Sequence, residues 1–183
     1  MAEVGERIAN PATGEQIEFL QTRETTAGEF LQFDLTLAPH GRVGGIPHQH
    51  PATETVDVVD GVLTCRLGRA RREVRAGERI VIPEARGHYL FNETPRPVRA
   101  VVVSRPARDF ETFFETVFAI AHERRYKAFR GLPPPLHAAL LSRTYDVYAP
   151  SIPISIQRML LDRLAPIARN RGYPVKLDPI RVA

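Results

Sequence analysis

The sequence predicts a mainly β protein, an antiparallel β-barrel or double-stranded β-helix (jelly roll), followed by about three C-terminal α-helices. Residues 7 to 103 divide into short stretches of alternating apolar and polar residues, separated by turns rich in Gly and Pro. Roughly eight to ten strands at this spacing are typical of a barrel or jelly roll. After Val103 the apolar residues recur at the three- and four-residue spacing of an amphipathic helix. The chain has 183 residues, 43% of them hydrophobic, which is enough to bury a sizeable core.

The β-strands are predicted from residues of alternating polarity bounded by turn residues. Leu31, Phe33, Leu35 and Leu37 show the pattern most clearly, because they share one face of a strand while polar residues occupy the other. Asp60-Gly61 and Ala76-Gly77 supply turns. The expected strands cover residues 7–10, 15–21, 29–37, 48–59, 62–67, 71–75, 79–82, 88–92 and 98–103.

Three helices are expected after the strands. The first carries an apolar stripe at i, i+3, i+4, i+7, i+8 and i+11, made by Phe110, Phe113, Phe114, Val117, Phe118 and Ala121. The second covers about residues 136–148, with Leu136, Leu140 and Val147 facing inward. The third covers about residues 154–170, with Ile156, Leu160, Leu164 and Ile167 facing inward.

We therefore expect a β domain at residues 1–104 and a helical extension at residues 105–183. The aromatic stripe needs a large apolar partner surface. It could cover the outer face of the barrel, form a contact in a homodimer or close the barrel mouth. Packing on the barrel or on a dimer partner is favoured.

Composition excludes several classes of protein. The net charge of +4 is concentrated after residue 103, but no run of Arg or Lys exceeds two residues, so no nucleic-acid partner is expected. One cysteine, Cys65, excludes an internal disulfide framework and a site with several thiolates. No stretch of 18 apolar residues and no signal-peptide pattern occurs, so we expect a cytoplasmic protein without a membrane partner.

Three candidate metal ligands lie close together in the sequence. His48, His50 and Glu54 have the same parity, so they project from one face of an extended strand if Pro51 keeps the register. Imidazole nitrogens and a carboxylate are suitable ligands for a transition metal. A buried Glu54 beside two histidines is costly unless it is paired or bound to a cation.

The spacing of these residues resembles the two signature motifs of the cupin superfamily. The first motif starts at His48 and ends at Gly61, and the second contains Gly77, Pro83, His88 and Asn92. The resemblance covers residues 41 to 92. It departs from the family at Arg42 and Ala85, where glycines are expected.

This resemblance implies a metal held inside the barrel by His48, His50, Glu54 and His88. The remaining motif residues, Gly61, Gly77, Pro83 and Asn92, would occupy turn-forming and structural positions. We accordingly expect one divalent transition metal per chain, either Fe, Mn, Ni or Zn, and the sequence does not choose among them.

The leading functional hypothesis is a metal-dependent enzyme that acts on a small organic substrate. The metal-dependent cupins that the sequence resembles include dioxygenases, isomerases, decarboxylases and lyases, and a dioxygenase is the activity that we name as a candidate. Catalytic residues beyond the ligands are not identified. Glu54 argues against the thiol dioxygenases, which lack that carboxylate. The alternative is a non-catalytic module that binds a small molecule or a metal. A third interpretation is a structural barrel without metal.

Other chemically active residues are expected to have ordinary structural roles. Cys65 shares the parity of Leu63 and Leu67, which indicates a core residue rather than a nucleophile. Tyr89 should face away from His88. The remaining candidates, expected at the surface, are His40, Arg66, Arg86, His122 and His137.

Overall fold

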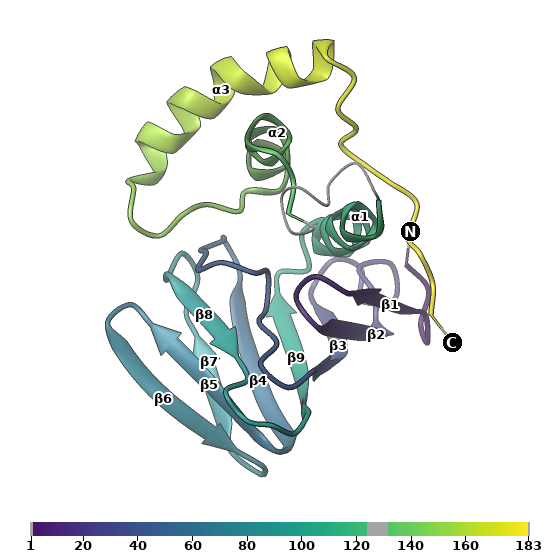
Figure 1. Cartoon of the computed structure of the whole chain (residues 1–183), viewed down its shortest axis with the longest axis vertical. Helices are drawn as coiled ribbons and strands as arrows, with labels where there is room; N and C mark the ends of the chain where they lie inside the picture. The colour runs from purple at the N-terminus through teal and green to yellow at the C-terminus, as the bar shows by residue number, and fades with distance from the viewer. Residues whose placement is uncertain (1, 124–131, 183) are drawn as a thin grey trace.

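The strands form two antiparallel sheets that face each other. The computed structural model describes residues 2–123 and 132–182, and within them one sheet has the order β1-β2-β3-β9-β4-β7 and the other β6-β5-β8. Figure 1 shows the two sheets side by side. The strands are β1 (Arg7–Asn10), β2 (Glu15–Gln21), β3 (Leu31–Leu37), β4 (Thr53–Asp60), β5 (Val62–Leu67), β6 (Ala70–Arg75), β7 (Arg79–Ile82), β8 (His88–Phe91) and β9 (Val98–Arg105).

This architecture is the predicted jelly roll. In the part of the chain that the structure describes, it consists of two sheets rather than a closed barrel. β9 lies between β3 and β4, so the last strand pairs with two strands far from it in the sequence. Gly61 and Gly77 both have positive φ, a conformation that glycine adopts without steric cost. Ala85, at an expected glycine position, also has a positive φ of 54°.

The core lies between the sheets. The four apolar residues of β3 are all buried, as their alternation predicts, and Val56 of β4 and Val102 of β9 join them. Burying such side chains stabilises the fold by about 1.5–3 kcal/mol each relative to leaving them exposed. The strand that was expected to start at His48 starts at Thr53 instead, because Pro51 and Ala52 form a bend.

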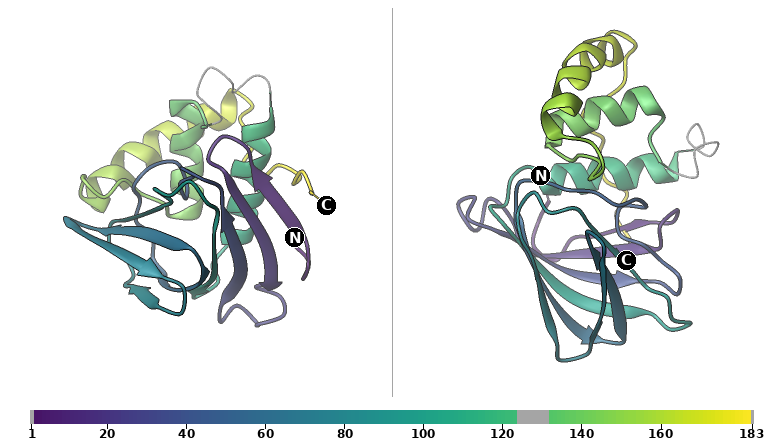
Figure 2. Two further views of the ribbon diagram at one scale, coloured as in Figure 1. Left: turned by 60° about the horizontal axis from the view of Figure 1, so that its bottom comes forward. Right: turned by 90° about the vertical axis from the view of Figure 1, so that its left-hand side faces the viewer.

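Three helices follow the strands: α1 (Phe110–His122), α2 (Pro135–Tyr145) and α3 (Ile154–Asn170). They stack at one end of the sheets, and both views of Figure 2 agree on this arrangement. Phe110 and Phe118 of α1 belong to the same buried cluster as the strand residues. Leu140 of α2 packs against Ala165 and Ala168 of α3. No helix among the described residues is long and apolar enough to cross a membrane.

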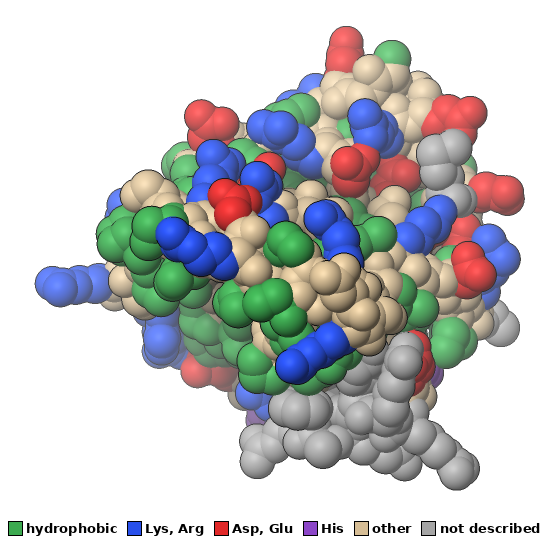
Figure 3. All heavy atoms as spheres, turned by 90° about the horizontal axis from the view of Figure 1, so that it is seen from above, with side chains coloured by type: hydrophobic (Ala, Val, Ile, Leu, Met, Phe, Trp, Pro, Cys, Tyr) green, Lys and Arg blue, Asp and Glu red, His purple; other side chains and the backbone are tan. Residues whose placement is uncertain are grey.

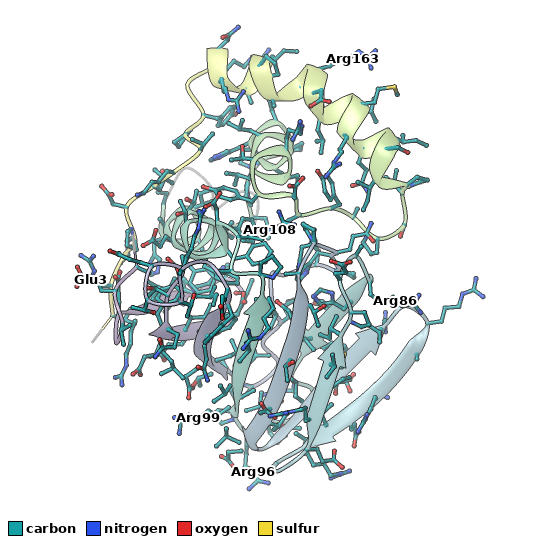
Figure 4. The ribbon with its side chains drawn as sticks, turned by 180° about the vertical axis from the view of Figure 1, so that it is seen from behind. Glu3, Arg86, Arg96, Arg99, Arg108 and Arg163 are labelled. Atoms are coloured by element: carbon teal, nitrogen blue, oxygen red, sulfur yellow. The ribbon has the colours of Figure 1, made fainter. Side chains whose placement is uncertain are left out.

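The prediction that the apolar stripe of α3 faces inward is wrong. Ala165 and Ala168 are its buried residues, whereas six apolar side chains on α3 or just before it are 39–50% exposed, namely Ile152, Ile156, Met159, Leu160, Leu164 and Ile167. The periodicity identifies an apolar stripe, but α2 covers only the small residues beside it. Figure 3, which looks down on the helices, shows hydrophobic side chains gathered at this surface among Arg and Lys side chains. Arg163 of α3 points outward (Figure 4).

Candidate metal centre

The four residues singled out by spacing come from three places in the fold. His48 precedes β4 and pairs with His88, the first residue of β8, through two backbone hydrogen bonds of 3.0 and 2.9 Å. His50 follows in the same connection, before the bend at Pro51. Glu54 lies on β4. The single strand face expected for His48, His50 and Glu54 is therefore not formed, and the bend together with the His48–His88 pairing brings these side chains together instead.

The side chains converge on one point. One nitrogen from each of His48, His50 and His88 lies within 4.8 Å of the others. Glu54 Oε1 lies 3.3 Å from His50 Nε2, and Glu54 Oε2 lies 3.6 Å from His88 Nε2. Three histidines at this separation could bind a metal ion.

Backbone carbonyls orient two of the imidazole rings. His48 Nδ1 lies 3.0 Å from the carbonyl oxygen of Ile46, and His88 Nδ1 lies 2.9 Å from that of Arg86. Since a carbonyl oxygen only accepts hydrogen bonds, the proton of each neutral ring resides on Nδ1. The lone pair on Nε2 is thereby left for a ligand, an arrangement common for metal-binding histidines.

Two buried nitrogens of the cluster lack hydrogen-bond partners among the described residues, namely His50 Nδ1 and His88 Nε2. Leaving a buried polar atom unpaired costs about 1–3 kcal/mol. For His88 Nε2, which points toward Glu54, a bound cation would remove this cost. The donor set thus fits a metal ion. His50 Nε2 already faces Glu54, so its unpaired Nδ1 lies on the side of the ring away from the carboxylate.

The charge states of the cluster match this donor set. Burial would raise the pKa of Glu54, but His50, His88 and His48 beside it hold that pKa well below its usual range. Burial, assisted by His88 and His50, lowers the pKa of His48 to about 3. Burial also lowers the pKa of His88. At neutral pH the site therefore presents the carboxylate of Glu54 and the neutral imidazoles of His48 and His88, which are the forms that bind metals.

Two functional candidates were not predicted from the sequence. Ser104 on β9 is buried and donates a hydrogen bond of 3.1 Å to Glu54 Oε1. Glu15 on β2 is buried and lines the same cavity as His48, His50 and Glu54. Glu15 shares the parity of Ile17 and Phe19, so its inward position had a sequence signal.

The other candidate residues mostly occupy the expected positions. Cys65 is buried, and burial raises the pKa of its thiol to about 11, which makes it a poor nucleophile. The residues found exposed as expected are His40, Arg66, Arg86 and His122. Tyr89 points to the carbonyl oxygen of Gly45, 3.4 Å away. The prediction for His137 is wrong, because its ring is buried against Tyr173 and its Nε2 lies 2.8 Å from the carbonyl oxygen of Pro174.

The protein is thus a double-sheet jelly roll that holds a cluster of three histidines and one glutamate between its sheets. Residues 33–104 match the family model described as the cupin domain. A solved RmlC-like cupin from Shewanella frigidimarina superposes with a TM-score of 0.50 at 16% identity, covering 61% of this chain and 93% of that one. Residues 33–104 therefore match a cupin domain, and the chain has the cupin fold.

Two further structures are each similar to slightly more than half of the chain. A predicted oxalate decarboxylase from Thermotoga maritima has a TM-score of 0.49 at 20% identity, covering 55% of this chain and 90% of that one. A sugar phosphate isomerase of the cupin superfamily from Silicibacter pomeroyi has a TM-score of 0.47 at 22% identity, covering 54% of this chain. This chain spans only 64% of the isomerase's length. The search of curated proteins found no match.

Proposed function

We propose that the protein is a metal-dependent cupin enzyme that acts on a small organic substrate. His48, His50, Glu54 and His88 would hold one divalent transition metal per chain. The observation that supports this most strongly is the convergence of three imidazoles on a buried carboxylate, with His88 Nε2 unpaired among the described residues. A metal with these four ligands keeps one or two open positions at which a substrate or oxygen can be polarised.

The surroundings of the cluster support a role in chemistry rather than in structure. The cavity beside His48, His50 and Glu54 is walled by apolar side chains, including Phe33 and Phe110. An apolar wall excludes water and strengthens electrostatic interactions within the site. Ring contacts hold the imidazoles in place, since the centroid of His50 lies 5.0 Å from that of Phe110 and 5.0 Å from that of His88.

Elemental analysis of the purified protein tests metal binding. We expect near-stoichiometric Fe, Mn, Ni or Zn in the wild-type protein and a loss of it in His50→Ala. His40→Ala is the matched control, because His40 is exposed and outside the cluster. Wild-type protein that stays metal-free after incubation with each of the four ions would refute the proposal.

Turnover separates the enzyme from the alternative, a non-catalytic binding module. A dioxygenase would consume oxygen only when a substrate and the metal are both present, and an isomerase or lyase would convert its substrate without oxygen. A broad screen of small organic compounds, followed by oxygen electrode and mass spectrometry, distinguishes these outcomes. A compound that binds tightly but is never converted would favour the binding module.

We further propose that the protein has a cupin domain at residues 1–104 and a helical extension at 105–183, and that it forms a homodimer in the cytoplasm. The boundary is supported by β9 ending at Arg105 and α1 beginning at Phe110. The dimer is supported by the exposed apolar side chains of α3. A reducing compartment is consistent with a single buried cysteine, Cys65. The proposal includes neither a nucleic-acid partner nor a membrane partner.

A further inference from the structure

Two cavities meet between the strands and the helices. The first lies beside His50 and Glu54 and has a volume of about 30 Å³. The second extends between the loop before β4, α1 and α2 and has a volume of about 210 Å³. Both are lined by Glu15, Val43, His48, Phe113, Phe114 and Val147. A molecule in the larger cavity would therefore lie next to the proposed metal ligand His48.

The walls of the larger cavity are almost entirely apolar. Phe113, Phe114 and Phe118 of α1 form an aromatic wall, and Ala138 and Leu141 of α2 lie among the other lining residues. The lining that the structure describes contains no Lys or Arg side chain. A dry cavity of about 150 Å³ lined by Leu, Ile and Phe binds benzene. The volume here suits a substituted aromatic ring, and offset or edge contacts with Phe side chains would favour it.

Glu15 supplies a polar group at the junction of the two cavities. It is 2% exposed, and its Oε2 accepts hydrogen bonds from Thr13 Oγ1 at 2.6 Å and from the backbone N–H of Gly44 at 3.1 Å. Its other oxygen, Oε1, receives no hydrogen bond from any residue that the structure describes. This oxygen is not among the fully enclosed unpaired atoms of the described residues, so it is accessible from the cavity, where a ligand can hydrogen-bond to it.

The side chains that the structure describes around the cavity favour an uncharged ligand. Burial raises the pKa of Glu15 to about 7, so the carboxyl can donate or accept a hydrogen bond near neutral pH. An anionic group beside Glu15 would meet no cationic side chain among the lining residues and would be repelled by the ionised carboxyl. A hydroxyl group can satisfy the carboxyl oxygen without bringing a charge into the cavity.

We propose that this cavity binds a small uncharged aromatic molecule with a hydroxyl group, its ring against Phe113 and Phe114 and its hydroxyl on Glu15 Oε1. The claim that such a molecule is the substrate of the enzyme rests on the function proposed above. The claim that the cavity binds such a molecule does not depend on the metal.

Titration of 4-fluorophenol into the metal-free full-length protein, followed by ¹⁹F NMR, tests the proposal. We expect saturable binding, with 4-fluorobenzoate at least about tenfold weaker because its charge must be buried. Glu15→Gln should weaken binding of 4-fluorophenol at pH 8 by about fivefold, since a hydrogen bond to a carboxylate is replaced by a neutral one. It should leave 4-fluorotoluene, which lacks the hydroxyl, unchanged. Glu18→Gln on the same strand is the matched control.

Filling the cavity gives an independent check. Val117 lines the larger cavity only, so Val117→Phe should abolish binding of both 4-fluorophenol and 4-fluorotoluene while metal uptake is retained. If that variant does not fold, Ala138→Leu fills the opposite wall. The proposal is overturned if 4-fluorobenzoate binds as tightly as 4-fluorophenol, or if a folded cavity-filling variant binds the probe as the wild-type protein does.

Metal uptake by the same protein preparations, measured after a separate incubation with Fe, Mn, Ni and Zn, separates this inference from the proposed function. Saturable binding of 4-fluorophenol by a protein that takes up no metal would support the cavity and refute the metal centre. Stoichiometric metal without any binding of the phenol would support the metal centre and refute the aromatic ligand.

Discussion

Ser104 Oγ donates a hydrogen bond of 3.1 Å to Glu54 Oε1, and the two residues face each other directly in the pairing of β9 with β4. Both are buried, so this bond is shielded from water. The same Glu54 oxygen lies 3.3 Å from His50 Nε2. The hydroxyl thereby fixes the rotamer of the carboxylate that faces the histidines.

Ser104→Ala should lower metal affinity without unfolding the protein. Removal of a hydrogen bond that orients a metal ligand typically costs 10- to 100-fold in affinity, and we expect a loss of about 10-fold for a neutral hydroxyl. Competition with a fluorescent zinc chelator measures the change. Ser151→Ala, at an exposed serine, is the control. An unchanged affinity in Ser104→Ala would show that the packing around Glu54 suffices to orient it.

Metal should stabilise the fold by mass action. A ligand at 100 times its dissociation constant adds about 2.7 kcal/mol to the free energy of unfolding if it binds only the folded state. For a chain of this size that corresponds to a rise in Tm of roughly 5–10 °C. Scanning calorimetry with and without added Zn(II) measures it. His88→Ala removes one nitrogen of the cluster and should abolish the shift, so an equal rise in that variant would contradict the proposed site.

Local patterns predict most of the strands and three candidate ligands, His48, His50 and Glu54, and the resemblance to the cupin motifs adds His88. The alternation in β3 predicts its buried face, and the turns at Gly61 and Gly77 follow from the positive φ that glycine tolerates. The spacing of His48, His50, Glu54 and His88 predicted a cluster that the structure brings together, although through a bend rather than along one strand.

What remained unpredicted depends on contacts between distant segments. Ser104 reaches Glu54 because β9 pairs with β4, a register that no local pattern specifies. The stripe of α3 was correctly recognised as apolar, but periodicity does not say which surface covers a stripe. His137 was placed at the surface because histidine is usually partly exposed, yet packing on Tyr173 buries it.

Glu15→Gln should change how stability depends on pH. The pKa of Glu15 is raised from 4.5 to about 7 in the folded protein, so between these values the folded state binds more protons than the unfolded state. The free energy of unfolding of the wild-type protein therefore falls as the pH rises from about 4.5 to 7, and the glutamine variant lacks this decline. Between pH 4.5 and 7, the free energy of unfolding of the variant should rise by on the order of 3 kcal/mol relative to that of the wild-type protein.

Urea titrations at pH values from 4.5 to 8 measure the effect of Glu15→Gln. Glu18→Gln serves as the control, because Glu18 lies on the outer face of β2 and pairs with Arg7 at 2.7 Å. Parallel curves for Glu15→Gln and wild type would mean that folding does not raise the pKa of Glu15.

A charge placed in the apolar stripe of α3 should dissociate the proposed homodimer. Leu160 is 49% exposed and lies in the middle of α3, so Leu160→Glu would bury a carboxylate in any interface formed there, at a cost of several kcal/mol. We expect light scattering after gel filtration to give a dimer for the wild-type protein and a monomer for Leu160→Glu, with unchanged metal content. Arg169→Glu changes the charge at an exposed side chain that lies roughly 180° around the helix from Leu160, so it should leave the dimer intact. A wild-type protein that is monomeric at micromolar concentrations would refute the dimer, and the exposed stripe would then need a different partner.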